Sequence, residues 1–169
     1  MKYAEKYNYE VIEIAAEDIN SINISSTQIR KAIESGNIEL ANQFLGYSFF
    51  ISGKVSEGKK LGRTIGFPTA NISISDVNKI IPKNGVYAVK VEIKNKLFNG
   101  MLNIGINPTV STTLQLKMEV HLFDFNQQVY GEEIKVSFIY RVRDEQKFSD
   151  IEALKNQLEL DKQHIMSLL

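Results

Sequence analysis

The sequence predicts a mainly β protein: a small closed antiparallel barrel, followed by one helix and preceded by a short helical region. Three observations support this fold class. Apolar and polar residues alternate with period two from Phe49 onward, turn residues separate the alternating runs, and the C-terminal residues change to a helical period. About five or six short antiparallel strands without an intervening helix are typical of a barrel that closes on itself.

Residues 1–46 are predicted to form one strand and two short helices. Val11, Ile12 and Ile14 indicate a short buried strand. The two helices that follow are too short to enclose a core alone, so this region must pack on another part of the protein.

Capping residues mark both of these helices. Residues 25–28 read SSTQ, which is a capping box, and Gly36 ends the first helix. Asn37 caps the second helix, which stops at Gly46.

Five alternating runs are predicted as barrel strands, at residues 49–55, 86–93, 97–104, 116–123 and 133–140. Turn residues lie between them at 83–85, 94–96 and 125–131. In the fourth run, one face consists of Leu116, Met118, Val120 and Leu122. The opposite face consists of Lys117, Glu119, His121 and Phe123.

A C-terminal helix is predicted from about Asp150 to Leu168. Ser149 and Glu152 form an S-x-x-E capping box at its start. An apolar stripe should lie across the barrel and consists of Ile151, Leu154, Leu158, Ile165 and Leu168.

Asp161 falls on this apolar stripe. A carboxylate there needs a partner, which we expect to be a backbone amide or an arginine of the Arg141/Arg143 segment. We interpret Asp161 as a structural residue.

Composition narrows the possible classes of protein. The 169 residues carry 20 basic and 20 acidic side chains, so a net charge of zero favours neither a nucleic-acid partner nor an anionic membrane surface. The absence of cysteine excludes disulfides and thiolate nucleophiles, and two histidines are too few for a histidine-rich metal site. No apolar run approaches the roughly 18 residues of a membrane span, and no signal peptide is visible. We therefore expect a soluble, cytoplasmic protein with no membrane partner.

Residues 58–71, GKKLGRTIGFPTAN, are richest in features that suggest chemistry. Glycines recur every four residues, with cations between them, so main-chain N–H groups and positive charge could meet a polyphosphate. The run matches neither the P-loop nor the dinucleotide pattern. On the glycines alone, a basic hairpin loop followed by an ordinary strand is the better explanation.

Two oxygen-bearing side chains close this segment. In an extended chain, the Thr69 hydroxyl and the Asn71 amide oxygen lie on one face, where they could hold a small hard cation.

The whole string resembles the signature of the riboflavin kinase family, GxxLGRxxGFPTAN. The resemblance continues in register and covers residues 47–169, with further matches at residues 103–109, 118–125, 129–134 and 143–148. It implies a six-stranded Greek-key barrel that uses ATP and Mg²⁺ to phosphorylate riboflavin at the ribityl 5′-hydroxyl, giving FMN and ADP. It also implies nucleotide binding by Gly58, Lys59, Gly62, Arg63, Gly66, Pro68, Thr69 and Asn71, with Thr69 and Asn71 as metal ligands.

The resemblance places the catalytic glutamate of the family at Glu119, as general base toward the ribityl hydroxyl. Without the motif, a single strand glutamate would be interpreted as a solvated surface residue. His121 shares this strand face, and its ordinary pKa would suit a base. Because its neighbour matches the family's base, we interpret His121 as a packing or hydrogen-bonding residue.

Two flaps are implied around the substrates. In the family, residues 143–148 form a mobile flap over the flavin, where Arg143 would stack on or hydrogen-bond to the isoalloxazine ring. A solvated turn explains this segment equally well. Asn103 is a second candidate for substrate binding, although turn stabilisation explains it nearly as well. Residues 58–64 would form the opposing flap over the nucleotide.

Residues 24–30, ISSTQIR, resemble an element of the nucleotidyltransferase domain in bacterial bifunctional riboflavin kinase/FAD synthetases. That α/β domain also needs a histidine motif upstream, and this chain has no histidine before His121. We therefore expect residues 1–46 to be a helical C-terminal remnant of that domain and residues 47–169 to be the kinase domain. FAD synthetase activity is expected only in a longer parent chain.

The alternative function is a regulatory barrel that binds flavin or nucleotide without catalysis. Thr69, Asn71 and Glu119 are all present and argue against it, because a module that only binds needs no base and metal ligands together. The sequence makes no prediction of the oligomeric state.

Overall fold

The structure is a computed structural model that describes residues 3–8, 10, 12, 18–19, 22–57, 61–74, 76, 78–108 and 114–169. Its helices are α1 (Ala4–Tyr7), α2 (Ser26–Ser35), α3 (Ile38–Leu45), α4 (Leu61–Thr64) and α5 (Ile151–Leu168). Its strands are β1 (Asp18–Ile19), β2 (Ile22–Asn23), β3 (Phe50–Ser56), β4 (Ala70–Ser73), β5 (Gly85–Ile93), β6 (Lys96–Pro108), β7 (Leu114–Leu122) and β8 (Glu133–Arg143).

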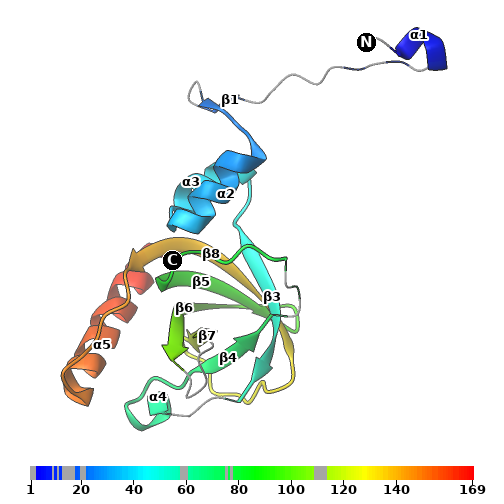
Figure 1. The fold of residues 1–169 in the computed structure, drawn as a ribbon. Coiled ribbons are helices and arrows are strands. Elements are labelled where there is room, and N and C mark those ends of the chain that lie inside the picture. Colours follow the sequence, from blue (N-terminus) through cyan, green and yellow to red (C-terminus); the bar gives the residue numbers. More distant parts are fainter. Residues whose placement is uncertain are drawn as a thin grey trace.

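Six antiparallel strands close into a barrel in the order β3-β4-β7-β6-β5-β8, which confirms the predicted fold class (Figure 1). Each alternating run predicted from the sequence corresponds to one strand, although Phe49 and Phe123 lie one residue outside β3 and β7, and the short strand β4 completes the barrel. The turn between β5 and β6 has Lys94 and Asn95 at φ values of 49° and 63°, which matches the right-handed twist of the two strands. Apolar side chains of the inward face fill the interior, where Tyr87 and Phe138 meet edge to face at 5.3 Å.

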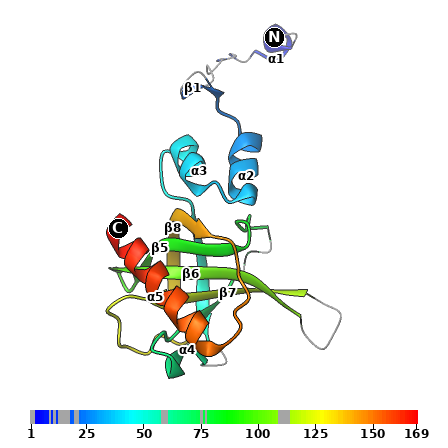
Figure 2. The ribbon, with the colours of Figure 1, turned by 90° about the vertical axis from the view of Figure 1, so that its left-hand side faces the viewer.

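Helices α2 and α3 pack against one end of the barrel, so the region predicted to need a packing partner finds it there (Figures 1 and 2). Ile33 and Ile38 are almost fully buried and belong to the same apolar core as the barrel strands. The Asn42 amide donates to the Phe138 carbonyl at 2.9 Å and accepts from the Phe49 N–H at 2.7 Å. One side chain of α3 thereby bridges strand β8 and the residue that precedes β3.

The predicted caps of these helices are confirmed. Ser25 accepts from the Gln28 N–H at 3.3 Å, and Asn37 accepts from the Leu40 N–H at 3.2 Å. The prediction of a buried strand near residues 11–14 is wrong at Ile12, which is 76 % exposed and lies in no strand. Val11 and Ile14 lie outside the described residues. A short hairpin follows, in which β1 and β2 have two residues each.

Helix α5 runs along the outer wall of the barrel (Figure 2). Its N-cap is Asp150, which accepts from the Ala153 N–H at 2.8 Å, so the predicted capping box that starts at Ser149 is wrong by one residue. The predicted apolar stripe is buried at Ile165, whereas Ile151 and Leu168 are 67 % and 45 % exposed. The stripe therefore packs closely on the barrel at Ile165, whereas Ile151 and Leu154 at its N-terminal end line a cavity.

None of the helices in the described part of the chain combines the length and the apolar character that a membrane crossing requires.

Candidate active site

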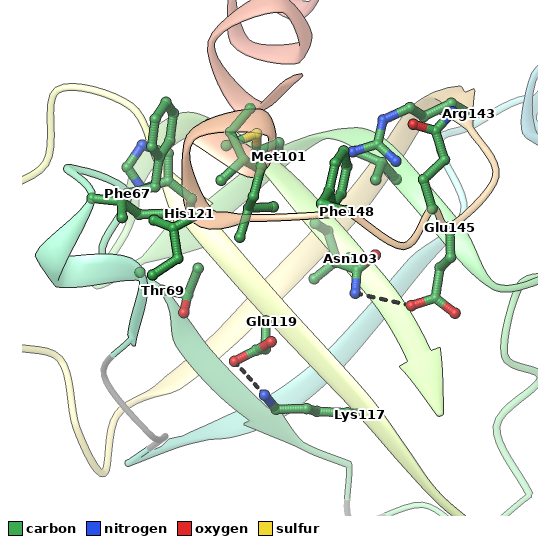
Figure 3. Close-up of a pocket in the computed structure, with 18 of the residues that line it drawn as sticks. Phe67, Thr69, Met101, Asn103, Lys117, Glu119, His121, Arg143, Glu145 and Phe148 are labelled. Carbon is green, nitrogen blue, oxygen red and sulfur yellow. Dashed lines mark hydrogen bonds and ion pairs between the residues drawn. The ribbon is translucent and has the colours of Figure 1, made fainter. Parts of the chain in front are cut away.

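A cavity of about 460 Å³ lies on the outer wall of the barrel, between strands β5 to β7, helix α5 and the segment around α4. Its apolar lining comes mainly from α5 and the strands, and its polar groups come from β7, β6 and the segment after β8. Figure 3 labels the residues that define it: Phe67, Thr69, Met101, Asn103, Lys117, Glu119, His121, Arg143, Glu145 and Phe148.

Three of the predicted site residues lie in one row across the barrel wall. Glu119 on β7 is directly opposite Asn71 on β4 and Asn103 on β6. Residues opposite each other in antiparallel strands point to the same face, so these polar side chains share the outer surface. The neighbouring residues Met118 and Val120 are buried in the barrel interior, which confirms the two faces predicted for this strand.

Glu119 is paired with a cation at the cavity wall. Its Oε1 lies 2.7 Å from Lys117 Nζ, and the two side chains are 24 % and 27 % exposed. Sequence reasoning missed Lys117, although its position two residues before Glu119 on the same strand face was a usable signal.

Asn71 carries a buried hydrogen-bonding group that has no partner among the described residues. Its Nδ2 is shielded from solvent and makes no hydrogen bond within the described residues. Such groups are rare because an unpaired buried donor costs about 1–3 kcal/mol. Asn71 does not itself line the cavity, but Thr69 and the directly opposite Glu119 both do, which makes Asn71 a candidate for ligand contact.

The segment around α4 makes a compact turn rather than an open glycine loop. A Cβ at Gly62 would lie 2.1 Å from the Phe67 carbonyl oxygen, so only glycine fits there. The Gly62 carbonyl accepts from the Ile65 and Phe67 N–H groups, and Arg63 accepts from Gly66. These three N–H groups are therefore unavailable to an anion in this conformation.

The other residues predicted to bind nucleotide fall into two groups. Gly58 and Lys59 lie outside the described residues. Arg63, Gly66 and Pro68 are exposed.

His121 is held inside the wall of the cavity. His121 is 7 % exposed, and its Nδ1–H donates to the Pro68 carbonyl at 2.7 Å. The centroid of its ring lies 5.2 Å from that of the Phe67 ring. Burial lowers the pKa of His121, the hydrogen bond to Pro68 opposes this effect, and nearby Lys162 adds to the lowering. These contacts agree with the interpretation of His121 as a packing and hydrogen-bonding residue.

Arg143 lines the cavity, but the N–H groups of its guanidinium already donate hydrogen bonds to other residues of the protein. Nε and Nη2 donate to the Asp161 carboxylate, and Nη1 donates to the Asp144 carbonyl at 3.0 Å. The guanidinium carbon lies 5.9 Å from the Phe148 ring centroid. The arginine partner predicted for Asp161 is thus confirmed as Arg143, and the pair joins β8 to α5.

Glu145 closes the cavity on the side of β6. Asn103 Nδ2 donates to Glu145 Oε1 at 3.3 Å (Figure 3). A Cβ at Gly105 would lie only 2.1 Å from the same oxygen, so the glycine leaves the space that this carboxylate occupies. Sequence reasoning missed Glu145 and Gly105, because no local pattern indicates that residues so far apart in the chain meet.

Comparison with protein families gives a match over most of the chain. Residues 45–169 match the family model described as Flavokinase: Riboflavin kinase. A Bacillus subtilis protein, bifunctional riboflavin kinase/FMN adenylyltransferase, is 50% identical over 142 residues, which are 83% of this chain and 45% of that protein. The Listeria monocytogenes protein of the same name is 44% identical over 162 residues, 96% of this chain and 51% of its own length. The chain therefore spans about half the length of the curated relatives it matches.

Two solved structures resemble this fold. A Streptococcus pneumoniae protein described as a macrolide-efflux protein has a TM-score of 0.88 and 38% identity, and the match covers 96% of this chain and 53% of that chain. Riboflavin kinase from Trypanosoma brucei has a TM-score of 0.51 and 24% identity, over 71% of this chain and 78% of that chain. At that identity the second comparison supports the fold alone.

Proposed function

Because the chain belongs to the riboflavin kinase family, we propose that it transfers the γ-phosphoryl group of ATP to the ribityl 5′-hydroxyl of riboflavin and so produces FMN and ADP. Riboflavin kinases take ATP as the phosphoryl donor, generally with a divalent metal. One observation carries the proposal for this site. Glu119 projects at the cavity wall between Asn71 and Asn103, beside a segment that bears the family's glycine and threonine motif.

We assign Glu119 as the general base. The hydroxyl oxygen of riboflavin attacks the γ-phosphorus, the bond from this phosphorus to the bridging oxygen of ADP breaks, and the hydroxyl proton passes to the Glu119 carboxylate. Its position at the wall of a partly enclosed cavity supports this role, because a base must reach the hydroxyl while bulk water is excluded.

Mg²⁺ fits the residues present, and we assign Thr69 Oγ1 and Asn71 Oδ1 to hold it. Mg²⁺ in phosphoryl-transfer sites takes few protein ligands and completes its shell with phosphate oxygens and water. Thr69 and Asn71 offer two neutral oxygen donors, and Asn71 lies directly opposite Glu119. When bound, the ion neutralises charge on the phosphates.

The remaining assignments follow the shape of the cavity. Its apolar lining, which includes Met101, Phe148 and Leu158, would take the isoalloxazine ring. Asn103 is assigned to the polar part of riboflavin. Arg143 is assigned to hold the segment 143–148 at the cavity mouth, since its donors are engaged by Asp161. The nucleotide is assigned to Gly58, Lys59, Gly62, Arg63, Gly66 and Pro68.

The test is incubation of the chain with riboflavin, ATP and Mg²⁺, followed by chromatographic separation of FMN from FAD. We expect FMN and no FAD, because the chain has no histidine before His121 for an adenylyltransferase motif. Riboflavin that stays unphosphorylated while it binds to the protein would instead favour a binding module.

Single substitutions test the two main assignments. Glu119→Gln keeps the side-chain shape but removes the base, so kcat should fall by about 10²–10⁴-fold with little change in riboflavin affinity. Glu133→Gln makes the same change on β8, outside the cavity, and should leave turnover unchanged. Thr69→Ala should raise the Mg²⁺ concentration that half-maximal activity requires, whereas Thr69→Ser keeps the hydroxyl and should not. Equal rates in Glu119→Gln and the wild type would refute the base assignment.

A further inference from the structure

Lys117 and Glu119 form an ion pair at the wall of the cavity. Two residues apart on β7, their side chains share the outer face of the barrel, and Nζ lies 2.7 Å from Oε1. Both side chains line the cavity, where each keeps about a quarter of its surface exposed (Figure 3). Such partial shielding strengthens the pair relative to one in open water.

The strand register shows which groups surround this ion pair. The residue directly opposite Lys117 on β6 is Gly105, and the Glu145 carboxylate occupies the space over this glycine. The two residues directly opposite Glu119 are amides, Asn71 and Asn103. Asn103 donates its amide to Glu145, and the buried Nδ2 of Asn71 has no partner among the described residues. Among the described residues, Lys117 is the cation paired with the Glu119 carboxylate.

We propose that Lys117 is a positioning residue for phosphoryl transfer, which acts by holding the Glu119 carboxylate toward the cavity. The inference rests on the proposed function and adds Lys117 to the residues that would take part in it. A glutamate side chain has three rotatable bonds, and its carboxylate is held only if a partner restricts them. Because a misplacement of a reacting group by about 1 Å can cost about 10²-fold in rate, loss of this restraint should affect turnover.

The test compares kcat with KM in purified Lys117 variants. Lys117→Met keeps the length of the stem and removes the charge, so kcat should fall by about 10-fold while the KM values for riboflavin and ATP stay within about twofold. Lys117→Arg restores a cation and should recover most of the rate. Lys117→Gln provides the same test if the methionine variant folds poorly. Lys135→Met, on β8 and outside the cavity, is the matched control and should be indistinguishable from the wild type.

A double-mutant cycle separates positioning from direct contact with substrate. If Lys117 acts through Glu119, Lys117→Met should cost nothing further in a Glu119→Gln background. A further loss of about 10-fold there would overturn the proposal, because Lys117 would then act on the substrate independently. An unchanged kcat in Lys117→Met, or a change confined to KM, would also overturn it. Failure of the wild-type chain to form FMN is a separate result, which would overturn the proposed function and this inference with it.

Discussion

The carboxylate of Asp161 on α5 makes three contacts with the guanidinium of Arg143 at the end of β8, at 3.0, 3.0 and 2.7 Å. Asp161 is 3 % exposed, and Gln157 donates a further hydrogen bond to it at 2.8 Å. Helix α5, which lines the cavity, is thus joined to the barrel wall by a buried, bidentate ion pair. Because segment 143–148 starts at this pair, the geometry of the cavity mouth depends on it.

Asp161→Asn should destabilise the protein and loosen the cavity mouth. Loss of the negative charge leaves the Arg143 guanidinium shielded and without a counter-ion, and breaking a buried pair in this way costs about 3 kcal/mol. We expect a lower urea midpoint and a higher riboflavin KM, measured by equilibrium unfolding and by initial rates. Gln157→Ala removes one hydrogen bond and keeps the ion pair, so it should cost only about 1 kcal/mol. Equal effects of the two substitutions would contradict this account.

Gly105→Ala should displace Glu145 without unfolding the barrel. The new Cβ would lie 2.1 Å from Glu145 Oε1, which is the end of a flexible side chain that can move away. The hydrogen bond from Asn103 would then be lost, and the segment 143–148 should become easier to cleave with a protease in limited digestion.

The double variant Gly105→Ala/Glu145→Ala is the control for this prediction. It removes the side chain that the new methyl group would meet, so it should behave like Glu145→Ala alone. An additional increase in cleavage would mean that Gly105 has a role independent of Glu145.

His121 should make the free energy of unfolding depend on pH below the ordinary imidazole pKa of 6.5. Burial lowers the pKa of His121 in the folded protein, so the unfolded chain takes up a proton first as the pH falls. This contribution to stability is complete above pH 6.5 and is lost progressively below it. His121→Asn keeps a donor for the Pro68 carbonyl and should flatten the slope of unfolding free energy between about pH 7 and pH 5, measured by urea titration.

Two carboxylates with displaced pKa values titrate outside the pH range of this experiment. Asp144 and Asp150 act only at lower pH, because Arg141 and Lys83 hold the pKa of Asp144 below 3.8 and the Ala153 N–H does the same for Asp150. If the unfolding free energy of His121→Asn kept the full dependence on pH, a group other than His121 would be responsible for it.

Asn42→Leu should weaken the attachment of the helical region to the barrel. A leucine of similar shape leaves the Phe138 carbonyl and the Phe49 N–H without their partner, which should cost about 2–3 kcal/mol in unfolding free energy. Asn37→Ala removes an exposed helix cap and should cost about 1 kcal/mol. A larger effect of Asn37→Ala, in thermal or urea unfolding, would show that Asn42 does not join the two regions.

Local patterns determined the elements of this fold. The period-two alternation placed Met118 and Val120 inside the barrel and Glu119 and His121 outside it, and Ser25 and Asn37 marked two helix starts correctly. The wrong N-cap of α5 is a local error of one residue, since Ser149 and Asp150 both cap helices well and only the backbone conformation selects Asp150.

Contacts between distant segments were decided by the tertiary structure. The row formed by Asn71, Glu119 and Asn103 depends on how β4, β7 and β6 align, and strand register is set by the packing of the whole barrel. Ile33 is buried in the barrel core, and the Glu145 carboxylate lies over Gly105. Both contacts are likewise between residues that are far apart in the chain. The sequence by itself determined which residues could form strands and caps and which segment resembles the riboflavin kinase signature, because each of these depends on near neighbours. Which side chains meet at the cavity was decided only when the barrel closed, because closure alone brings those strands and α5 together.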